Sequence, residues 1–181
     1  MVSNFPMSMS YNNTHMFDFT DIRPCVKKNN TKYCHNSIMD ILNKNPNFSK
    51  FRYIMKLSGM DLIYDDAMAD FTLFVPSDDC VRAIPEDVFL NLDIGSARDI
   101  VKTHTIKRRI TYDLLKDSPI SYFFSTNDSE KLSVTNISGI TTINNCSCVL
   151  YPDIQACNGI IHVVNNMIWP YSFLSTTSYS K

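Results

Sequence analysis

The hydrophobic period of this chain changes once, near Ile106, and that change limits the folds available to it. Before this point, apolar residues recur at helical spacing, as in Ile38, Ile41 and Leu42. After it, short apolar-polar alternations are separated by Asn, Asp, Ser and Gly, which favour turns. Helices first and short strands later is the order of an α+β domain. We therefore predict an α+β fold.

The same patterns predict the individual elements. A helix from Ser37 should end before Pro46, and a second, capped by Asn47, should stop at Gly59. Further helices are expected around Leu62, Ile63 and Met68, after Ser77 and Ser96 as N-caps, and from Pro85 with Val88, Phe89 and Leu92 inward. Strands are expected over residues 71–75, 109–112, 121–124, 131–134, 141–143, 148–151 and 160–165.

Composition indicates one folded domain with polar ends. The 181 residues are 44% hydrophobic and 19% charged, which is typical of globular proteins. Residues 1–36 are polar and aperiodic, so we expect an irregular N-terminal extension there, a domain over 37–170 and a short polar tail over 171–181. We recognise neither a conventional signal peptide nor a transmembrane run of about 18 apolar residues.

The charge balance argues against a nucleic-acid binder. The chain has 17 basic and 18 acidic residues and a formal net charge of −1, so a broad basic surface is not expected. Its compact basic run is Lys107-Arg108-Arg109. A solvated turn beside a strand explains this run, and a docking patch for an anionic partner is the alternative.

Six cysteines leave the redox state open, because they are even in number but sparse for a disulfide scaffold. Cys80 follows Ser77 on an apolar face and is expected to be a small core residue. The candidates for disulfides are Cys25, Cys34, Cys146, Cys148 and Cys157. A metal site is the rival interpretation, but the spacing lacks the paired C-x2-C of structural zinc sites. We predict no metal and no cofactor.

Two segments of the chain resemble a known family. Phe71-Thr72-Leu73-Phe74-Val75-Pro76-Ser77-Asp78-Asp79 reads as a buried strand that leads into a capped helix. The segment from Asn158 to Pro170 combines an Asn158-Gly159 turn, an apolar run and a terminating proline. Together they resemble the paired signatures of the fasciclin (FAS1) domain, and the similarity extends over about residues 37–170. The signature residues are Phe71, Thr72, Pro76, Ser77, Asn158, Gly159 and His162.

The resemblance implies a wedge of two β-sheets with several helices packed on one side, and an adhesive or interacting role. His104 corresponds to the histidine of the family's Tyr-His dipeptide, a position implicated in integrin-dependent adhesion in animal members. Thr103 stands where the tyrosine is usual, which argues against a direct transfer of integrin binding. The candidate interaction residues are Thr103, His104, Lys107, Arg108 and Arg109.

The two histidines within apolar patterns, His104 and His162, have a structural and a catalytic interpretation. As core residues, their ring nitrogens would bond to backbone or to nearby side chains. As catalytic residues, one of them would join Ser77 and Asp78 or Asp79 in a hydrolase triad. The sequence lacks a G-x-S-x-G nucleophile elbow, and Ser77 already has a predicted capping role. We therefore predict core histidines and no enzymatic activity.

The leading function is a non-catalytic protein-interaction or adhesion module. The alternatives are a virion or particle component that self-associates through its N-terminal arm and, behind it, a hydrolase-like enzyme or metal-binding protein. The partner would be a protein or a second copy, not nucleic acid; contact with glycans or membrane surfaces stays open. Family members are extracellular or at the cell surface, whereas a leaderless, Asn-rich chain fits a large DNA virus or AT-rich protist, and hence a virion or cytoplasm.

Overall fold

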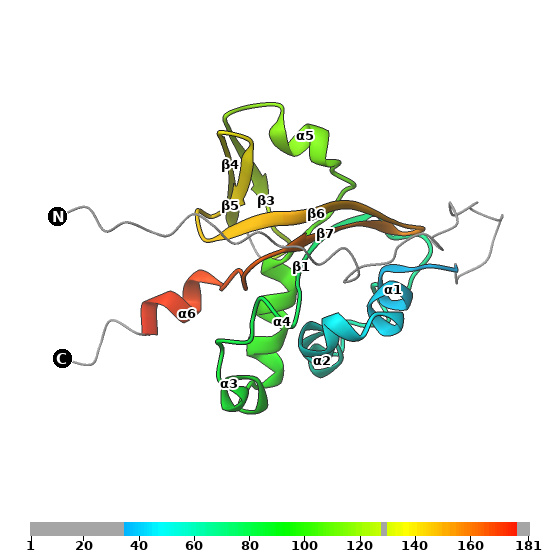
Figure 1. The fold of residues 1–181 in the computed structure, drawn as a ribbon. Helices are drawn as coiled ribbons and strands as arrows, with labels where there is room; N and C mark the ends of the chain where they lie inside the picture. The colour runs from blue at the N-terminus through cyan, green and yellow to red at the C-terminus, as the bar shows by residue number, and fades with distance from the viewer. Residues whose placement is uncertain (1–34, 128–129, 177–181) are drawn as a thin grey trace.

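A computed structural model of the chain describes residues 35–127 and 130–176 (Figure 1). Six α-helices and a 3-10 helix lie within these ranges: α1 Ile38–Lys44, η1 Pro46–Phe48, α2 Ser49–Ser58, α3 Glu86–Leu90, α4 Ile94–Thr103, α5 Tyr112–Lys116 and α6 Tyr171–Thr176. The strands in the same ranges are β1 Phe71–Pro76, β2 Thr105–Ile106, β3 Ile120–Phe124, β4 Lys131–Ile137, β5 Ile140–Ile143, β6 Ser147–Ala156 and β7 Gly159–Val164.

The strands form one hydrogen-bonded order, β2-β1-β7-β6-β5-β4-β3. β1 and β7 run parallel, and the other named pairs are antiparallel. The two predicted sheets are thus joined, because the start of β6 pairs with β5 through Thr142 and Cys148. An isolated bridge between Ile106 and Ser125 also brings β2 to the end of β3. The predicted α+β class is confirmed, with the two sheets as halves of one wedge.

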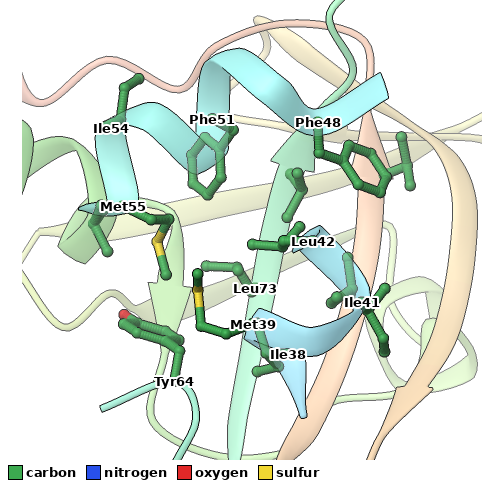
Figure 2. Close-up of a cluster of buried hydrophobic side chains, with 14 of the residues drawn as sticks. Ile38, Met39, Ile41, Leu42, Phe48, Phe51, Ile54, Met55, Tyr64 and Leu73 are labelled. Atoms are coloured by element: carbon green, nitrogen blue, oxygen red, sulfur yellow. The ribbon is translucent and has the colours of Figure 1, made fainter. Parts of the chain in front are cut away.

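Two hydrophobic clusters lie on the two sides of β1 and β7. Leu73 and Val75 of β1 face the helices, whereas Phe74, between them, faces the interior formed with β3, β4 and β5. Figure 2 shows the helical cluster, in which Phe51 of α2 and Tyr64 converge on Leu73. Most helices cover this side, but α5 lies on the opposite side of the long strands (Figure 1).

Local caps determine where several helices begin and end. Ser37 begins α1 by accepting a hydrogen bond from the Asp40 N–H at 3.0 Å. Gly59 ends α2 as predicted, with a positive φ of 67°. The prediction of Ser96 as the cap of α4 is wrong: Asp93 is the N-cap and accepts a bond from the Ser96 N–H at 2.9 Å.

Five other predictions of elements or positions are wrong. Residues 61–67 form turns instead of a helix, and Leu62, Ile63 and Met68 are exposed. Asn45, not Asn47, caps the 3-10 helix before α2. The chain after Ser77 forms successive turns rather than a helix, and Ser77 Oγ donates to Cys80 Sγ at 3.1 Å. Residues 109–112 form no strand because α5 begins at Tyr112. Val88 of α3, expected to point inward, is exposed.

The Asn158-Gly159 turn is held by side-chain bonding and close packing rather than by positive φ. Asn158 Oδ1 accepts from the Ile38 N–H at 2.9 Å, and its Nδ2 donates to the Tyr64 carbonyl at 2.6 Å. A Cβ at Gly159 would lie 2.3 Å from the Phe71 carbonyl oxygen, so a side chain there would push β1 away. Neither residue adopts the positive φ that is usual in Asn-Gly hairpin turns. The turn thereby ties β7 to α1 and to the start of β1.

The predicted tail begins with a helix. Phe173 of α6 packs against the helical core, and its ring centroid lies 5.6 Å from that of Trp169. The first six residues of the predicted tail thus form α6, and residues 177–181 lie outside the described residues.

Candidate functional site

His104 ends α4 inside the protein core. Its Nδ1 lies 2.6 Å from the Phe74 carbonyl oxygen, and its Nε2 accepts a hydrogen bond from the Ile168 N–H at 3.0 Å. Because Nε2 accepts, the proton of the neutral ring must be on Nδ1, which donates to Phe74. Burial lowers the pKa of His104 to about 4. The predicted core role is confirmed, and a surface contact through this side chain is excluded by its complete burial.

His162 of β7 forms hydrogen bonds to two other segments and is in the opposite tautomer. Its Nδ1 accepts from the Asp153 N–H at 3.2 Å, so its Nε2 carries the proton and donates to the Ile110 carbonyl at 2.8 Å. Burial also lowers the pKa of His162. Its ring stacks on Phe74 with centroids 5.6 Å apart. The predicted core role of His162 is therefore confirmed as well.

Thr103 is buried and joins α4 to the β3–β4 connection. Its hydroxyl donates to Glu130 Oε2 at 2.8 Å and accepts from Asn127 Nδ2 at 3.1 Å. Glu130 Oε1 also accepts from the Tyr171 N–H at 3.0 Å. The prediction of Thr103 and His104 as direct contact residues is thus wrong in its simplest form, because neither side chain reaches the surface.

The basic segment that follows is held by Thr72 of β1. The Thr72 hydroxyl donates to the Arg108 carbonyl at 2.7 Å and accepts from the Ile110 N–H at 2.8 Å. The side chains of Lys107 and Arg108 remain exposed. The Arg108 guanidinium lies over the Phe123 ring, 5.6 Å from its centroid. The side chains of Lys107 and Arg108 therefore project from a backbone that Thr72 holds in place.

Arg109 differs from its two basic neighbours because its guanidinium is already bonded. It pairs with Asp70 Oδ1 at 3.1 Å and donates to Gln155 Oε1 at 3.0 Å. It also donates to the Ala156 carbonyl at 3.2 Å. These bonds connect the start of β1 with the end of β6. The structure brings Arg109 next to the predicted contact residues but gives it a bracing role.

The structure does not assemble the hydrolase triad that the sequence allowed as an alternative. Ser77 donates to Cys80, while both ring nitrogens of His104 and of His162 bond to backbone groups. No group of three His, Cys, Asp or Glu side chains arranged to hold a metal ion occurs in residues 35–127 or 130–176. Over the same ranges, no helix combines the length and apolarity needed to cross a membrane.

The cysteines divide into two groups. Cys80, Cys146 and Cys148 are free, so the prediction that Cys146 and Cys148 enter disulfides is wrong in this structure. Cys146 lies in the β5–β6 turn, where burial raises the pKa of its thiol, and Cys80 is half-buried rather than in the core. Cys157 is buried and is not among the free thiols. The other predicted partners, Cys25 and Cys34, lie outside the described residues.

Comparison with known protein families matches residues 46–170 to the fasciclin domain, over more than half of the chain. The chain belongs to the fasciclin family. Among curated proteins, the rabbit (Oryctolagus cuniculus) transforming growth factor-beta-induced protein ig-h3 is 24% identical over 140 residues, covering 76% of this chain and 20% of the relative. Human (Homo sapiens) stabilin-1 is 28% identical over 130 residues, covering 71% of this chain and 5% of the relative.

Structural comparison supports the same fold. A FAS1 domain pair from the insect cell adhesion molecule fasciclin I matches with a TM-score of 0.66 and 21% identity. The match covers 76% of this chain and 52% of the insect chain. The chain thus spans about half of that structure and a fifth or less of the length of its curated relatives. What it shares with them is one fasciclin domain.

Several residues that organise this fasciclin domain were not found by sequence reasoning. Asp153, at φ 63° within an irregular part of β6, directs its N–H to His162 and accepts from the Tyr112 N–H at 2.9 Å. Pro152, a residue that marks bulges in strands, could have signalled this distortion. Glu130 has no comparable signal, because its contacts join segments that are distant in sequence.

Proposed function

We propose that this fasciclin domain is a non-catalytic interaction module of adhesive type, which binds an anionic protein surface through Lys107 and Arg108. Family membership supports the general class. The insect protein with the same fold is described as a cell adhesion molecule. The observation that supports this surface is the fixed backbone around the exposed Lys107 and Arg108 side chains. Ile106 pairs with Thr72 just before them, and the Thr72 hydroxyl binds the Arg108 carbonyl and the Ile110 N–H just after them.

This arrangement supports binding because the backbone and the Arg108 side chain are already ordered before a partner binds. The Thr72 bonds hold the backbone, and the Arg108 guanidinium already lies on the Phe123 ring. Preorganised groups lose less conformational entropy on association. His104 and Thr103 act beneath this surface as positioning residues, since they join α4 to β1 and to Glu130. The family's histidine position thereby supports the site without touching a partner.

A cell-adhesion assay on surfaces coated with the full chain tests this proposal. The double variant Lys107→Ala/Arg108→Ala should lose at least about half of the adhesion, and the wild-type signal should weaken with salt, because exposed charge interactions are screened. Arg109 is left intact, since its bonds to Asp70 and Gln155 brace the fold. Lys56→Ala/Arg82→Ala is the matched control, because it removes two exposed cations from the helical side.

The control separates a specific surface from the general loss of positive charge. Equal adhesion by the wild type and the Lys107/Arg108 variant would remove this surface from the proposal. Equal losses in both double variants would indicate attraction by net charge alone. Thermal unfolding of each variant, monitored by circular dichroism, should match the wild type because all four side chains lie at the surface.

A further inference from the structure

One face of the β3–β5 unit exposes large apolar side chains to solvent. Ile120, Tyr122 and Phe124 alternate along β3 and are 57%, 63% and 61% exposed. Ile137 and Ile140 pair across the β4–β5 hairpin and are also exposed. The opposite side of the same strands supplies the buried interior, including Phe123 and Leu132. We call the outward set, together with Lys131, the β3–β5 face.

Lys131 places a positive charge at one end of this apolar face. It pairs with Phe124 across the β3–β4 ladder, and its Nζ lies 5.9 Å from the Tyr122 ring centroid and 6.0 Å from that of Phe124. Strands β3, β4 and β5 contain no other charged residue. Lys131 forms no ion pair with the described residues. A matching surface would therefore combine apolar side chains with carboxylates.

The loop over residues 61–70 has that complementary chemistry. Leu62 and Met68 are 74% and 84% exposed, and Ile63 is also exposed. The loop contains four aspartates and no lysine or arginine. Asp70 is paired with Arg109, and the other three aspartates form no ion pair with the described residues. It is fixed from within by Tyr64, whose hydroxyl lies 2.6 Å from Thr105 Oγ1, and by Asn158, which binds the carbonyls of Tyr64 and Asp66. Its exposed apolar groups are therefore held ready for contact.

The β3–β5 face and the 61–70 loop lie at opposite ends of β6. The first residues of β6 pair with β5, whereas its last residue pairs with Gly159, next to the Asn158 that holds the loop. Ten residues in strand conformation separate these ends by roughly 30 Å. Figure 1 shows β3, β4 and β5 at one end of β6 and the β6–β7 turn beside α1 at the other.

We propose that copies of this chain associate head to tail, with the β3–β5 face of one copy on the 61–70 loop of the next. The two surfaces cannot meet within one chain, but they can meet between chains because both are preformed and opposite in charge. Such a contact joins different surfaces of the two partners, so it produces open rows or rings instead of an isolated two-fold dimer. It is separate from the proposed Lys107–Arg108 surface and does not depend on it.

Sedimentation velocity of the full chain over about a hundredfold range of concentration tests this association. The wild-type mass should rise above the 20.8 kDa of one chain as concentration increases. Tyr122→Glu removes a ring and places a carboxylate opposite the acidic loop; Met68→Lys removes an apolar contact and places a cation opposite Lys131. Each variant should weaken association at least about tenfold, because charge repulsion is added to lost apolar burial.

An equimolar mixture of the two variants gives the decisive result. Tyr122→Glu keeps an intact loop and Met68→Lys keeps an intact face, so one wild-type contact can form in the mixture, which should associate more strongly than either variant alone. Ile94→Glu and Leu90→Lys are controls that place the same charges at exposed apolar positions at helix ends, where those charges are tolerated. Both controls should associate as the wild type does.

Three outcomes would overturn the proposal. The first is a wild-type chain that stays monomeric at every concentration. The second is self-association of Met68→Lys at wild-type strength, which would indicate a face-to-face contact. The third is association that persists in Tyr122→Glu, which would place the contact elsewhere, as in the N-terminal segment. Lys107→Ala/Arg108→Ala should associate normally, so failure of the adhesion proposal is distinguishable from failure of this one.

Discussion

Two single residues, the buried His104 and His162, stabilise this fold when their rings are neutral. Each imidazole uses one nitrogen as donor and the other as acceptor. Protonation of the accepting nitrogen would replace this hydrogen bond with two N–H groups that face each other. Sequence reasoning found their burial because both lie in apolar patterns. It could not assign the tautomers, since those depend on the Ile168 and Asp153 N–H groups brought close by the fold.

His104 predicts a loss of stability in mild acid. Its pKa is about 4 in the folded protein and 6.5 for an ordinary histidine, so the unfolded chain binds the proton first as pH falls. The free energy of unfolding should be highest above pH 6.5 and should fall by roughly 3 kcal/mol toward pH 4. Urea unfolding at a series of pH values measures this fall. NMR titration of the imidazole in the folded protein checks the cause, and a His104 midpoint near 6.5 would contradict it.

At the scale of elements, sequence patterns predicted most strands and the longer helices, but several caps came from distant segments. The alternation in 120–124 and 131–137 is local information, and β3 and β4 formed where expected. The start of α2 is different, because its N-cap residue Phe48 has no capping side chain. Asp78, expected to lie in the first turn of a helix after Ser77, instead serves α2. A cap 29 residues away has no signature in a sequence window.

Asp78→Ala should therefore destabilise α2 rather than the segment in which Asp78 lies. The carboxylate accepts from the Ser49 N–H at 3.0 Å and the Lys50 N–H at 2.9 Å, and it also binds the Ser49 hydroxyl. Loss of such a cap costs about 1–2 kcal/mol of unfolding free energy. Asp79→Ala is the matched control: it breaks an exposed pair with Arg82, which should cost less than about 0.5 kcal/mol. Equal urea midpoints for the two variants would refute the capping role.

At the scale of the whole molecule, the fasciclin motifs predicted the wedge because they specify its parallel strand pair. The 71–76 and 159–164 segments became the parallel pair β1 and β7, around which the other strands and the helices are arranged. The same motifs could not predict the exposed surfaces. In the sequence, β3 shows only the usual alternation of a strand. The strand pairing reveals that its exposed aromatic side chains lie beside Lys131.

We predict that a disulfide joins the domain to the N-terminal segment and that it links Cys157 to Cys25 or Cys34. Cys157 is buried, its N–H donates to the Asn36 carbonyl at 3.0 Å, and Cys34 is two residues before Asn36. Such a bond would close a loop of over 100 residues and stabilise the fold by about 5 kcal/mol in the chain-entropy account. Alkylation of the chain unfolded without reductant, followed by peptide mapping, should label Cys80, Cys146 and Cys148 and leave Cys157 unlabelled until reductant is added. Labelling of Cys157 at the first step would show that the tether is absent.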